Sequence, residues 1–401
     1  MTMRVTQSLN QTQFLSALDT LESNLSQTQN QVSSGLNFTS PSQDPIAAGA
    51  VNNYDQALAQ SQQYTANGNS AQTSLQTEDT ALSQLQNQLQ SLRSLALEAN
   101  SGTQTGEDLT AIAEQATQIQ NSLLTLANTQ DGNGQYIFSG FASQTQPFSL
   151  TATGASYAGD QGQNQIQIAA GQTLASGDNG DVVFNQIKTG NGVFTVAANA
   201  ANTGSGVIGA TTVTGTAGYT GGTFSINFTA ANAYQVENAA HVVVATGTYS
   251  PGQTITYGGA QVTLSGQPAV GDYFNVTTSA NQSLFTTVQN LVNALQAGAS
   301  GGASGNTNLN NGVAAALNNI DQAISQTSTV QASVGGRLNT ITTQQSVQTS
   351  QQTQLQQSIS SLQSLDYASA ITSLDSQNTT LSAAMQAYTL TQGLSLFKYI
   401  Q

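Results

Sequence analysis

The sequence contains no cysteine and only one histidine, His241. These absences exclude disulfide bridges, thiolate metal sites, cysteine nucleophiles and any metal site that needs two histidines. Catalysis by His241 would need a partner that positions its ring, and the sequence offers no such partner, so a structural or surface role is favoured. We therefore expect a protein that is not an enzyme, with no catalytic residue, no metal site and no cofactor.

Charge is also scarce, because only 6% of the 401 residues are charged, against about 25% in average proteins. Five basic residues stand against nineteen acidic ones, which gives a formal net charge of −14. Nucleic acids and anionic membrane surfaces are bound by clustered basic residues, so we expect neither as a partner. The composition favours a weakly ionic assembly or binding protein.

Long hydrophobic runs are missing as well. No run reaches the roughly 20 apolar residues that span a bilayer, so no membrane insertion is expected. The first residues lack the continuous apolar core of a cleavable signal peptide. Any export would then use a route without signal cleavage.

What the sequence does contain is helical periodicity at both ends. Phe14, Leu18, Leu21 and Leu25 follow one another at steps of 4, 3 and 4, the spacing of a coiled-coil seam. Gly35 and the prolines at 41 and 45 predict the end of this helix. A second helix should carry the leucines from 75 to 92, and a third should begin near residues 107–108 and run through Leu126.

From about residue 131 to residue 276 the pattern changes to short alternating stretches separated by glycines, which predicts β-strands. Examples are residues 223–228, 262–264 and 241–244, the last of which contains His241. Asn179-Gly180 lies between two such stretches, residues 165–168 and 182–184, and predicts a tight turn between them.

Helical spacing returns at Leu284 and continues to the end, with a loop predicted at the glycine-, serine- and asparagine-rich residues 298–312. The last run predicts a second seam in which Asn378 is the single polar member. Its members step by 3, 4, 3, 4 and 3: Ile371, Leu374, Asn378, Leu381, Met385 and Tyr388.

Two acidic patterns are better explained by structure than by chemistry. Residues 178–181 have a superficial likeness to a calcium loop, but they lack the EF-hand spacing and its distal glutamate, so a turn is favoured. The adjacent acids at 78–79 and 107–108 point apart on a helix, which argues against a glycosidase pair.

These patterns predict an α+β fold, in which the N- and C-terminal segments form a long antiparallel helical coiled coil or bundle with an inserted all-β domain. Two paired helices leave their outward faces uncovered. Because these faces carry few charges, neighbouring subunits could bury them without stranding ions. The alternative is that the helices are simply solvated and the composition reflects the host.

Several segments resemble the flagellin superfamily and, within it, the hook-associated protein 3 class of hook–filament junction proteins. Residues 31–35 with 41–45 are similar to its SSG…PSDDP turn, with Gln43 in place of an acid. The ending, Leu394-Ser395-Leu396-Phe397-Lys398-Tyr399-Ile400, resembles its LSLFDYI, with Lys398 in place of an acid. The other segments with a counterpart in the class are residues 3–6, 92–100, 134–140, 157–160 and 266–274.

The resemblance implies five parts: an inner-tube helix at 1–45, a helical hairpin domain at 46–145, an outer all-β domain at 146–280, returning helices at 281–365, and a second inner-tube helix at 366–401. It implies a ring of about eleven copies between hook and filament, bound to the hook-side junction protein and to filament flagellin. It also implies export by the flagellar type III apparatus with a cytosolic chaperone, and an extracellular place in the flagellum.

We expect subunit contacts to be made by the apolar residues of the two ends: Phe14, Leu18, Leu21, Leu25, Leu381, Met385, Leu394, Leu396 and Phe397. Two alternatives stay open. One is a filament flagellin. The other is a surface adhesin or binding protein that uses the β domain, where tyrosine and threonine are frequent at 249–257, although strands favour these residues anyway.

Overall fold

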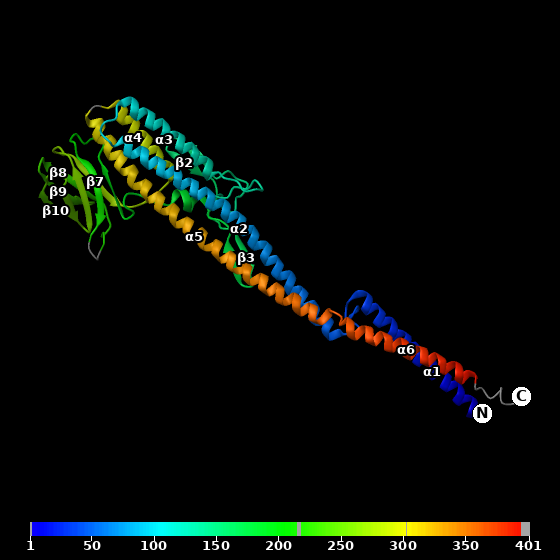
Figure 1. Ribbon diagram of the computed structural model, residues 1–401. Helices are drawn as coiled ribbons and strands as arrows, with labels where there is room; N and C mark the ends of the chain where they lie inside the picture. The colour runs from blue at the N-terminus through cyan, green and yellow to red at the C-terminus, as the bar shows by residue number, and fades with distance from the viewer. Residues whose placement is uncertain (1, 215–217, 302, 394–401) are drawn as a thin grey trace. The chain divides into compact units, whose positions relative to one another are not determined.

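Helices form both ends of the chain and strands form its middle (Figure 1). The computed structural model describes residues 2–214, 218–301 and 303–393. The terminal helices run antiparallel, because Phe14 lies beside Tyr388 while Leu36, further along, lies beside Ser364. The predicted α+β class is therefore confirmed.

The helices are α1 (Thr2–Ser34), α2 (Pro45–Ala99), α3 (Gly106–Ala127), α4 (Leu284–Ser300), α5 (Ala303–Gln363) and α6 (Tyr367–Gly393), with a π-helical turn η1 (Asp181–Asn185). The strands are β1 (Phe148–Thr151), β2 (Gly154–Tyr157), β3 (Gln165–Ala169), β4 (Gln172–Ala175), β5 (Ile187–Lys188), β6 (Phe194–Ala198), β7 (Val207–Val213), β8 (Phe224–Ala230), β9 (Ala233–Asn238), β10 (Val243–Thr248), β11 (Thr254–Tyr257), β12 (Ala260–Ser265), β13 (Tyr273–Thr278) and β14 (Asn281–Gln282). They form two compact units, Met1–Ala66 with Gln345–Gln401 and Asn67–Gln344, so α2 and α5 each contribute to both.

The predicted break between the first two helices is confirmed in the first unit, where α1 ends at Ser34 and α2 begins at Pro45. Gly35 has a φ of 73°, and a Cβ there would lie 2.7 Å from the hydroxyl of Tyr367, so only glycine suits this position. The backbone N–H of Asn37 donates to the carbonyl of Gln363 at 2.7 Å. A small core supports the turn: Phe38, Ala47, Ala48 and Val51, with Ile359 and Leu362 against them.

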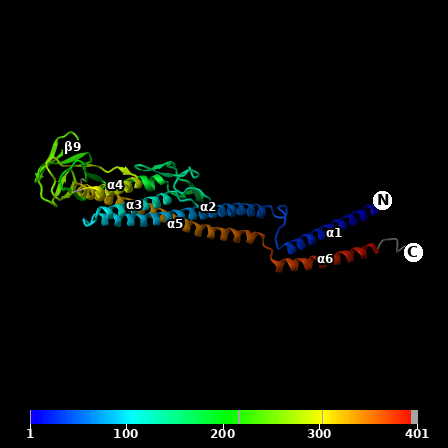
Figure 2. The same cartoon turned by 90° about the horizontal axis from the view of Figure 1, so that it is seen from above.

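The second unit is built on a helical core to which α2, α3, α4 and α5 all contribute. Helices α3 and α4 lie side by side (Figures 1 and 2). The predicted leucine seam of α2 is buried at every position: Leu75, Leu82, Leu85, Leu89 and Leu92. Full burial of one leucine side chain stabilises the fold by about 1.5–3 kcal/mol, so this seam is a principal source of the unit's stability.

Helix α3 begins where the acidic pair predicts it. The Thr105 hydroxyl accepts a hydrogen bond from the backbone N–H of Asp108 at 3.2 Å, and the Asp108 carboxylate accepts from the N–H of Thr105 at 2.9 Å. This reciprocal capping box satisfies two backbone donors at the helix start. The hydroxyl and the N–H of Thr105 lower the pKa of Asp108.

The predicted break within residues 298–312 is confirmed, but the loop is far shorter than predicted, because α4 ends at Ser300 and α5 begins at Ala303. A Cβ on Gly312 would lie 2.6 Å from the Cβ of Ala294, and a Cβ on Gly298 would lie 2.9 Å from the Leu309 side chain. These glycines allow α4 and α5 to approach closely. The composition that predicted a loop therefore serves helix packing instead.

Residues 194–278 contain an antiparallel five-stranded sheet of order β10-β9-β8-β13-β6 and a three-stranded sheet of order β11-β12-β7. The predicted strands at 223–228 and 262–264 are confirmed by β8 and β12. Ile226 and Phe274 from the first sheet and Ile208 and Val262 from the second lie in one core, so the sheets pack as a sandwich.

The buried Asn311 of α5 forms hydrogen bonds that connect this sandwich to the helices. Its side chain accepts from the N–H of Ile208 at 2.8 Å and donates to the carbonyl of Gly206 at 3.0 Å. Asn319, two turns further along α5, accepts from the N–H of Gly190 at 2.8 Å. Two asparagines on one helix therefore hold backbone groups of the β region.

The tight turn predicted at Asn179-Gly180 is wrong. Strand β3 pairs instead with β4, and Val183 and Phe184 lie in η1. Gly180 has an ordinary helical φ of −66°, and a Cβ on it would lie 2.6 Å from the Phe148 ring. Glycine is needed there for close packing against an aromatic core residue rather than for a turn.

Candidate assembly surface

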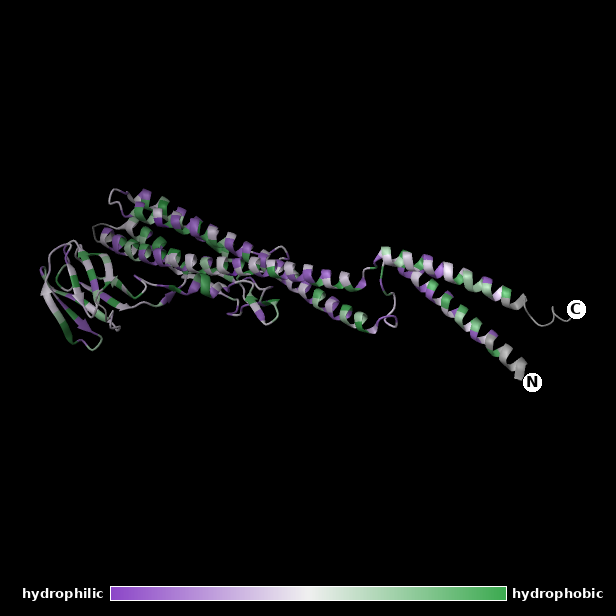
Figure 3. Ribbon diagram, turned by 60° about the horizontal axis from the view of Figure 1, so that its bottom comes forward, coloured by the Kyte–Doolittle hydropathy of each residue, from purple (hydrophilic) through white to green (hydrophobic). Residues whose placement is uncertain are grey.

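Helices α1 and α6 form the candidate site, and their facing side chains are only partly covered. Phe14, Leu18, Leu21 and Leu25 of α1 are all half-buried, and Thr28 continues their spacing as a buried residue. Apolar residues recur along both helices (Figure 3). In a pair of helices each helix can bury only one face, so the apolar seam of α1 is covered by α6 alone within this pair.

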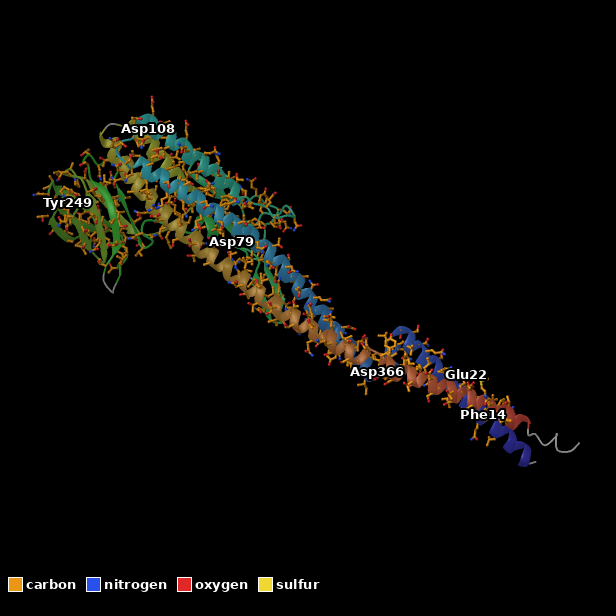
Figure 4. The ribbon with its side chains drawn as sticks, in the orientation of Figure 1. Phe14, Glu22, Asp79, Asp108, Tyr249 and Asp366 are labelled. Carbon is orange, nitrogen blue, oxygen red and sulfur yellow. The ribbon has the colours of Figure 1, made fainter. Side chains whose placement is uncertain are left out.

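An aromatic pair joins the two helices. The rings of Phe14 and Tyr388 stack with centroids 5.0 Å apart and an interplanar angle of 9°, and Figure 4 labels Phe14 on α1. The Gln11 side-chain amide donates to the Tyr388 hydroxyl at 3.3 Å. Such a ring pair contributes about 0.5–1.5 kcal/mol beyond its area burial, so it fixes the register of α1 against α6.

The register predicted for α6 is wrong at three positions, because Ile371, Asn378 and Met385 are exposed. Helix α6 turns a neighbouring line of residues inward, and its polar member is Gln377 in place of Asn378. The half-buried line is Leu374, Gln377, Leu381, Ala384 and Tyr388. Both lines alternate steps of three and four residues, and they share Leu374, Leu381 and Tyr388. Spacing alone therefore could not show which line faces α1.

The outward faces of this pair carry apolar residues and little charge. Met385 is 53% exposed and Leu390 is 70% exposed, and Leu9, Leu15 and Ile371 are exposed as well. Within Tyr367–Gly393 the sequence has one charged residue, Asp375. Of the other expected contact residues, Leu394, Leu396 and Phe397 lie outside the described residues.

The start of α6 is held by a local cap. The Asp366 carboxylate accepts from the N–H groups of Ala368 and Ser369 and from the Ser369 hydroxyl at 2.9 Å. The hydroxyl and N–H of Ser369, together with the N–H of Ala368, lower the pKa of Asp366. The helix that presents the apolar face is therefore capped from its first turn.

Two of the segments that carried the resemblance hold loops together. The Tyr157 hydroxyl donates to the carbonyl of Asp160 at 2.7 Å, and the Asp160 carboxylate accepts from the N–H of Phe141 at 2.9 Å. Buried Asp272 accepts from the N–H groups of Thr203 and Gly204 at 2.8 and 2.9 Å. Their conformational role explains these residues without a ligand.

The residues considered for chemistry lie apart. His241 is not on a strand but in the turn before β10, with a φ of 57°, a 90% exposed side chain and the Glu237 carboxylate 3.5 Å away. Asp178 pairs with Arg337 of α5 beside Glu78 of α2, a grouping that sequence spacing could not predict because its members are far apart in the chain. Across residues 2–214, 218–301 and 303–393, no three acidic or histidine side chains gather to hold a metal ion. None of the helices in these ranges is long and apolar enough to cross a membrane.

The family model of the bacterial flagellin N-terminal helical region matches residues 5–143. Flagellar hook-associated protein 3 of Escherichia coli is 35% identical over 173 residues, which are 43% of this chain and 54% of that protein. The Salmonella typhimurium protein of the same name is 35% identical over 157 residues, 39% of this chain and 49% of its own length. The chain thus spans about half the length of the curated relatives it matches.

Solved structures match over more of the chain. FlgL from Xanthomonas campestris is 32% identical with a TM-score of 0.72, and the match covers 77% of this chain and 99% of that one. Flagellar hook-associated protein 3 from Legionella pneumophila is 29% identical with a TM-score of 0.73, covering 78% and 98%. The chain belongs to the hook-associated protein 3 (FlgL) family, which is related to flagellin.

Proposed function

We propose that this protein is a structural subunit of the bacterial flagellum that forms the junction between hook and filament. Its relatives from Escherichia coli and Salmonella typhimurium are named flagellar hook-associated protein 3, and a Legionella pneumophila structure 28% identical to this chain is described as a flagellar junction protein. The role requires self-assembly and no reaction. The protein would act outside the cell, in the flagellum.

The observation that carries the proposal is the incomplete burial of the terminal helix pair. Phe14, Leu18, Leu21, Leu25 and Leu381 are half-buried. Met385 is exposed on α6, a helix whose sequence has one charged residue, Asp375. Burying apolar area is favourable by about 25 cal/mol per Å², so stacking of copies along these faces would complete the burial.

The finer parts of the proposal follow from the family. Residues 1–45 and 366–401 would line an inner tube, residues 46–145 and 281–365 would form the layer around it, and residues 146–280 would face outward. A ring of copies would contact the hook-side junction protein on one side and filament flagellin on the other. A cytosolic chaperone would escort the chain to the flagellar type III apparatus.

The absence of cysteine gives a direct test. Val270 is an exposed residue of the β sandwich, so Val270→Cys creates a unique attachment point for a thiol-reactive gold label. Electron microscopy of flagella from cells that carry this variant should show label in one band where the hook meets the filament. The unsubstituted protein, which has no thiol, measures background labelling.

Label spread along the filament would overturn the junction role and support the filament-flagellin alternative. Label absent from flagella but present on the cell surface would support the adhesin alternative. Deletion of residues 394–401 tests the remaining contact residues, Leu394, Leu396 and Phe397. It should abolish assembly while the β sandwich stays folded, and normal filament growth would contradict the proposed contacts.

A further inference from the structure

Three charged side chains from three separate segments meet inside the second unit. Glu78 comes from α2, Asp178 from the loop before η1, and Arg337 from α5. Glu78 is 2% exposed, and the side chains of Asp178 and Arg337 are 11% and 12% exposed. Arg337 forms an ion pair with the Asp178 carboxylate and donates to the carbonyl of Ala175 at 3.3 Å.

The hydrogen bonds of this group leave one carboxylate oxygen without a donor. The backbone N–H of Asp178 donates to Oε1 of Glu78 at 3.2 Å, and the amide of Gln163 donates to Oδ1 of Asp178 at 2.7 Å. Oε2 of Glu78 is buried and has no hydrogen-bond partner among the described residues. An ionised carboxylate would be costly there, whereas a protonated one supplies its own donor.

The charge balance points the same way. Two carboxyl groups face a single guanidinium, which pairs with Asp178 through one terminal nitrogen while its Nε has no hydrogen-bond partner among the described residues. Burial raises the pKa of Glu78 well above its ordinary value, the charge of Asp178 raises it further, and Arg337 lowers it by less. Like-charged carboxyl groups that share a buried site do not both ionise readily.

A cavity of about 430 Å³ adjoins the group. Its wall includes Glu78 and Asp178, and the other titratable groups that face it are Asp131 and Tyr136 from the loops after α3. Asp79, the next residue of α2 (Figure 4), is engaged elsewhere, since it accepts from Gln331 of α5 at 3.0 Å. The cavity gives solvent protons a path to the carboxyl pair.

We propose that Glu78, beside the Asp178–Arg337 ion pair, forms a proton-binding site, in which the proton on Glu78 holds the β3–β4 hairpin and the loop after it against α2 and α5. The hairpin also contacts these helices in other ways: the amide of Asn67 donates to the carbonyl of Gln167 at 2.8 Å, Arg337 donates to the carbonyl of Ala175, and Ile166 and Leu174 pack against the helical core. When the proton leaves, the buried group has a net negative charge, and the hairpin is released more often. This inference does not depend on the junction role.

The raised pKa of Glu78 sets the direction in which pH changes the docking of the hairpin. A carboxyl group whose pKa is raised in the closed state binds its proton more tightly there than in the open state. Its contribution to docking is therefore full below the ordinary glutamate value of 4.5 and is lost as the pH rises through the raised value. Between these limits the equilibrium constant for opening should rise about tenfold per pH unit.

Hydrogen exchange of the full chain, read on peptides that cover residues 160–180 and corrected for the intrinsic pH dependence of exchange, measures this opening. Wild type should show the rise, and Glu78→Gln should flatten it, because the amide keeps the size of the side chain but does not titrate. The matched control is Glu98→Gln, an exposed glutamate on the same helix, which should keep the wild-type slope. A flat wild-type profile, or the same slope in Glu78→Gln, would overturn the proposal.

A second variant and a direct signal keep the test independent of whether Glu78→Gln folds. Asp178→Asn removes the neighbouring negative charge, so the rise should stop at a lower pH than in wild type. In wild type with isotope-labelled glutamate, infrared spectroscopy should show a protonated carboxyl band that persists as the pH rises above the ordinary glutamate value of 4.5. Absence of this band, or an unchanged endpoint in Asp178→Asn, would contradict the proton on Glu78.

Discussion

The clearest test of the assembly surface is Met385→Gln. The substitution keeps the length and helix propensity of the side chain but makes it polar. Met385 is 53% exposed, so about half of its burial remains available to a neighbouring copy. Full burial of a methionine is worth about 1.5–3 kcal/mol, so the exposed 53% corresponds to about 0.8–1.6 kcal/mol, or about a 4- to 15-fold loss in the association constant.

The same change should leave the isolated subunit nearly unaffected, since exposed substitutions usually alter stability by no more than about 0.5 kcal/mol. Self-association is measured by sedimentation velocity over a concentration series, and subunit stability by circular dichroism during denaturant unfolding of a dilute sample. Leu97→Gln is the matched control, because Leu97 is an exposed residue of α2 in the second unit. Equal losses of association in the two variants, or no loss in Met385→Gln, would show that Met385 does not lie in the assembly interface.

Three further outcomes are expected. Asn311→Ala leaves the N–H of Ile208 and the carbonyl of Gly206 buried and unpaired, at a cost of about 1–3 kcal/mol each. Hydrogen exchange in β7 should therefore accelerate in this variant. It should not accelerate in the control Asn308→Ala, because Asn308 is exposed. Thr105→Ala should destabilise the start of α3 by about 1 kcal/mol. Because the pKa of Asp108 is lowered in the folded protein, Asp108 contributes stability above its ordinary pKa of 3.8, and this stability is lost as the pH falls. Thr105→Ala should therefore lose less stability in acid than wild type, as measured by thermal melts. Equal acid sensitivity of the two proteins would contradict the cap. Assembly should change little between low and moderate salt because α1 and α6 carry few charges, and a steep dependence in light scattering would contradict an apolar interface.

Periodicity in the sequence predicted the helices well because long helices repeat one signal many times. The leucines of α2 are buried as expected, and the break from Gly35 to Pro45 ends and restarts a helix where the backbone chemistry requires it. The pairing of the chain ends also follows, because each end has an apolar line that its own segment cannot bury.

What failed was the interpretation of glycine and asparagine. Gly180 and Gly312 allow neighbouring atoms to approach, rather than forming a turn or a loop. Asn311 looks like a loop residue in sequence, yet it is a buried anchor for β-strand backbone. The contact between Glu78 and Asp178 could not be predicted from the sequence, because the two residues meet only after α2 and the β region have packed.

The outward faces of the terminal helices should become covered only when copies of the chain assemble. Hydrogen exchange of dilute subunit and of the assembled form, compared peptide by peptide, tests it most directly. Residues 9–25 of α1 and 371–390 of α6 should exchange at least about tenfold more slowly after assembly, while the buried α2 residues 75–92 should not change. Terminal helices that exchange equally slowly in both forms would contradict it.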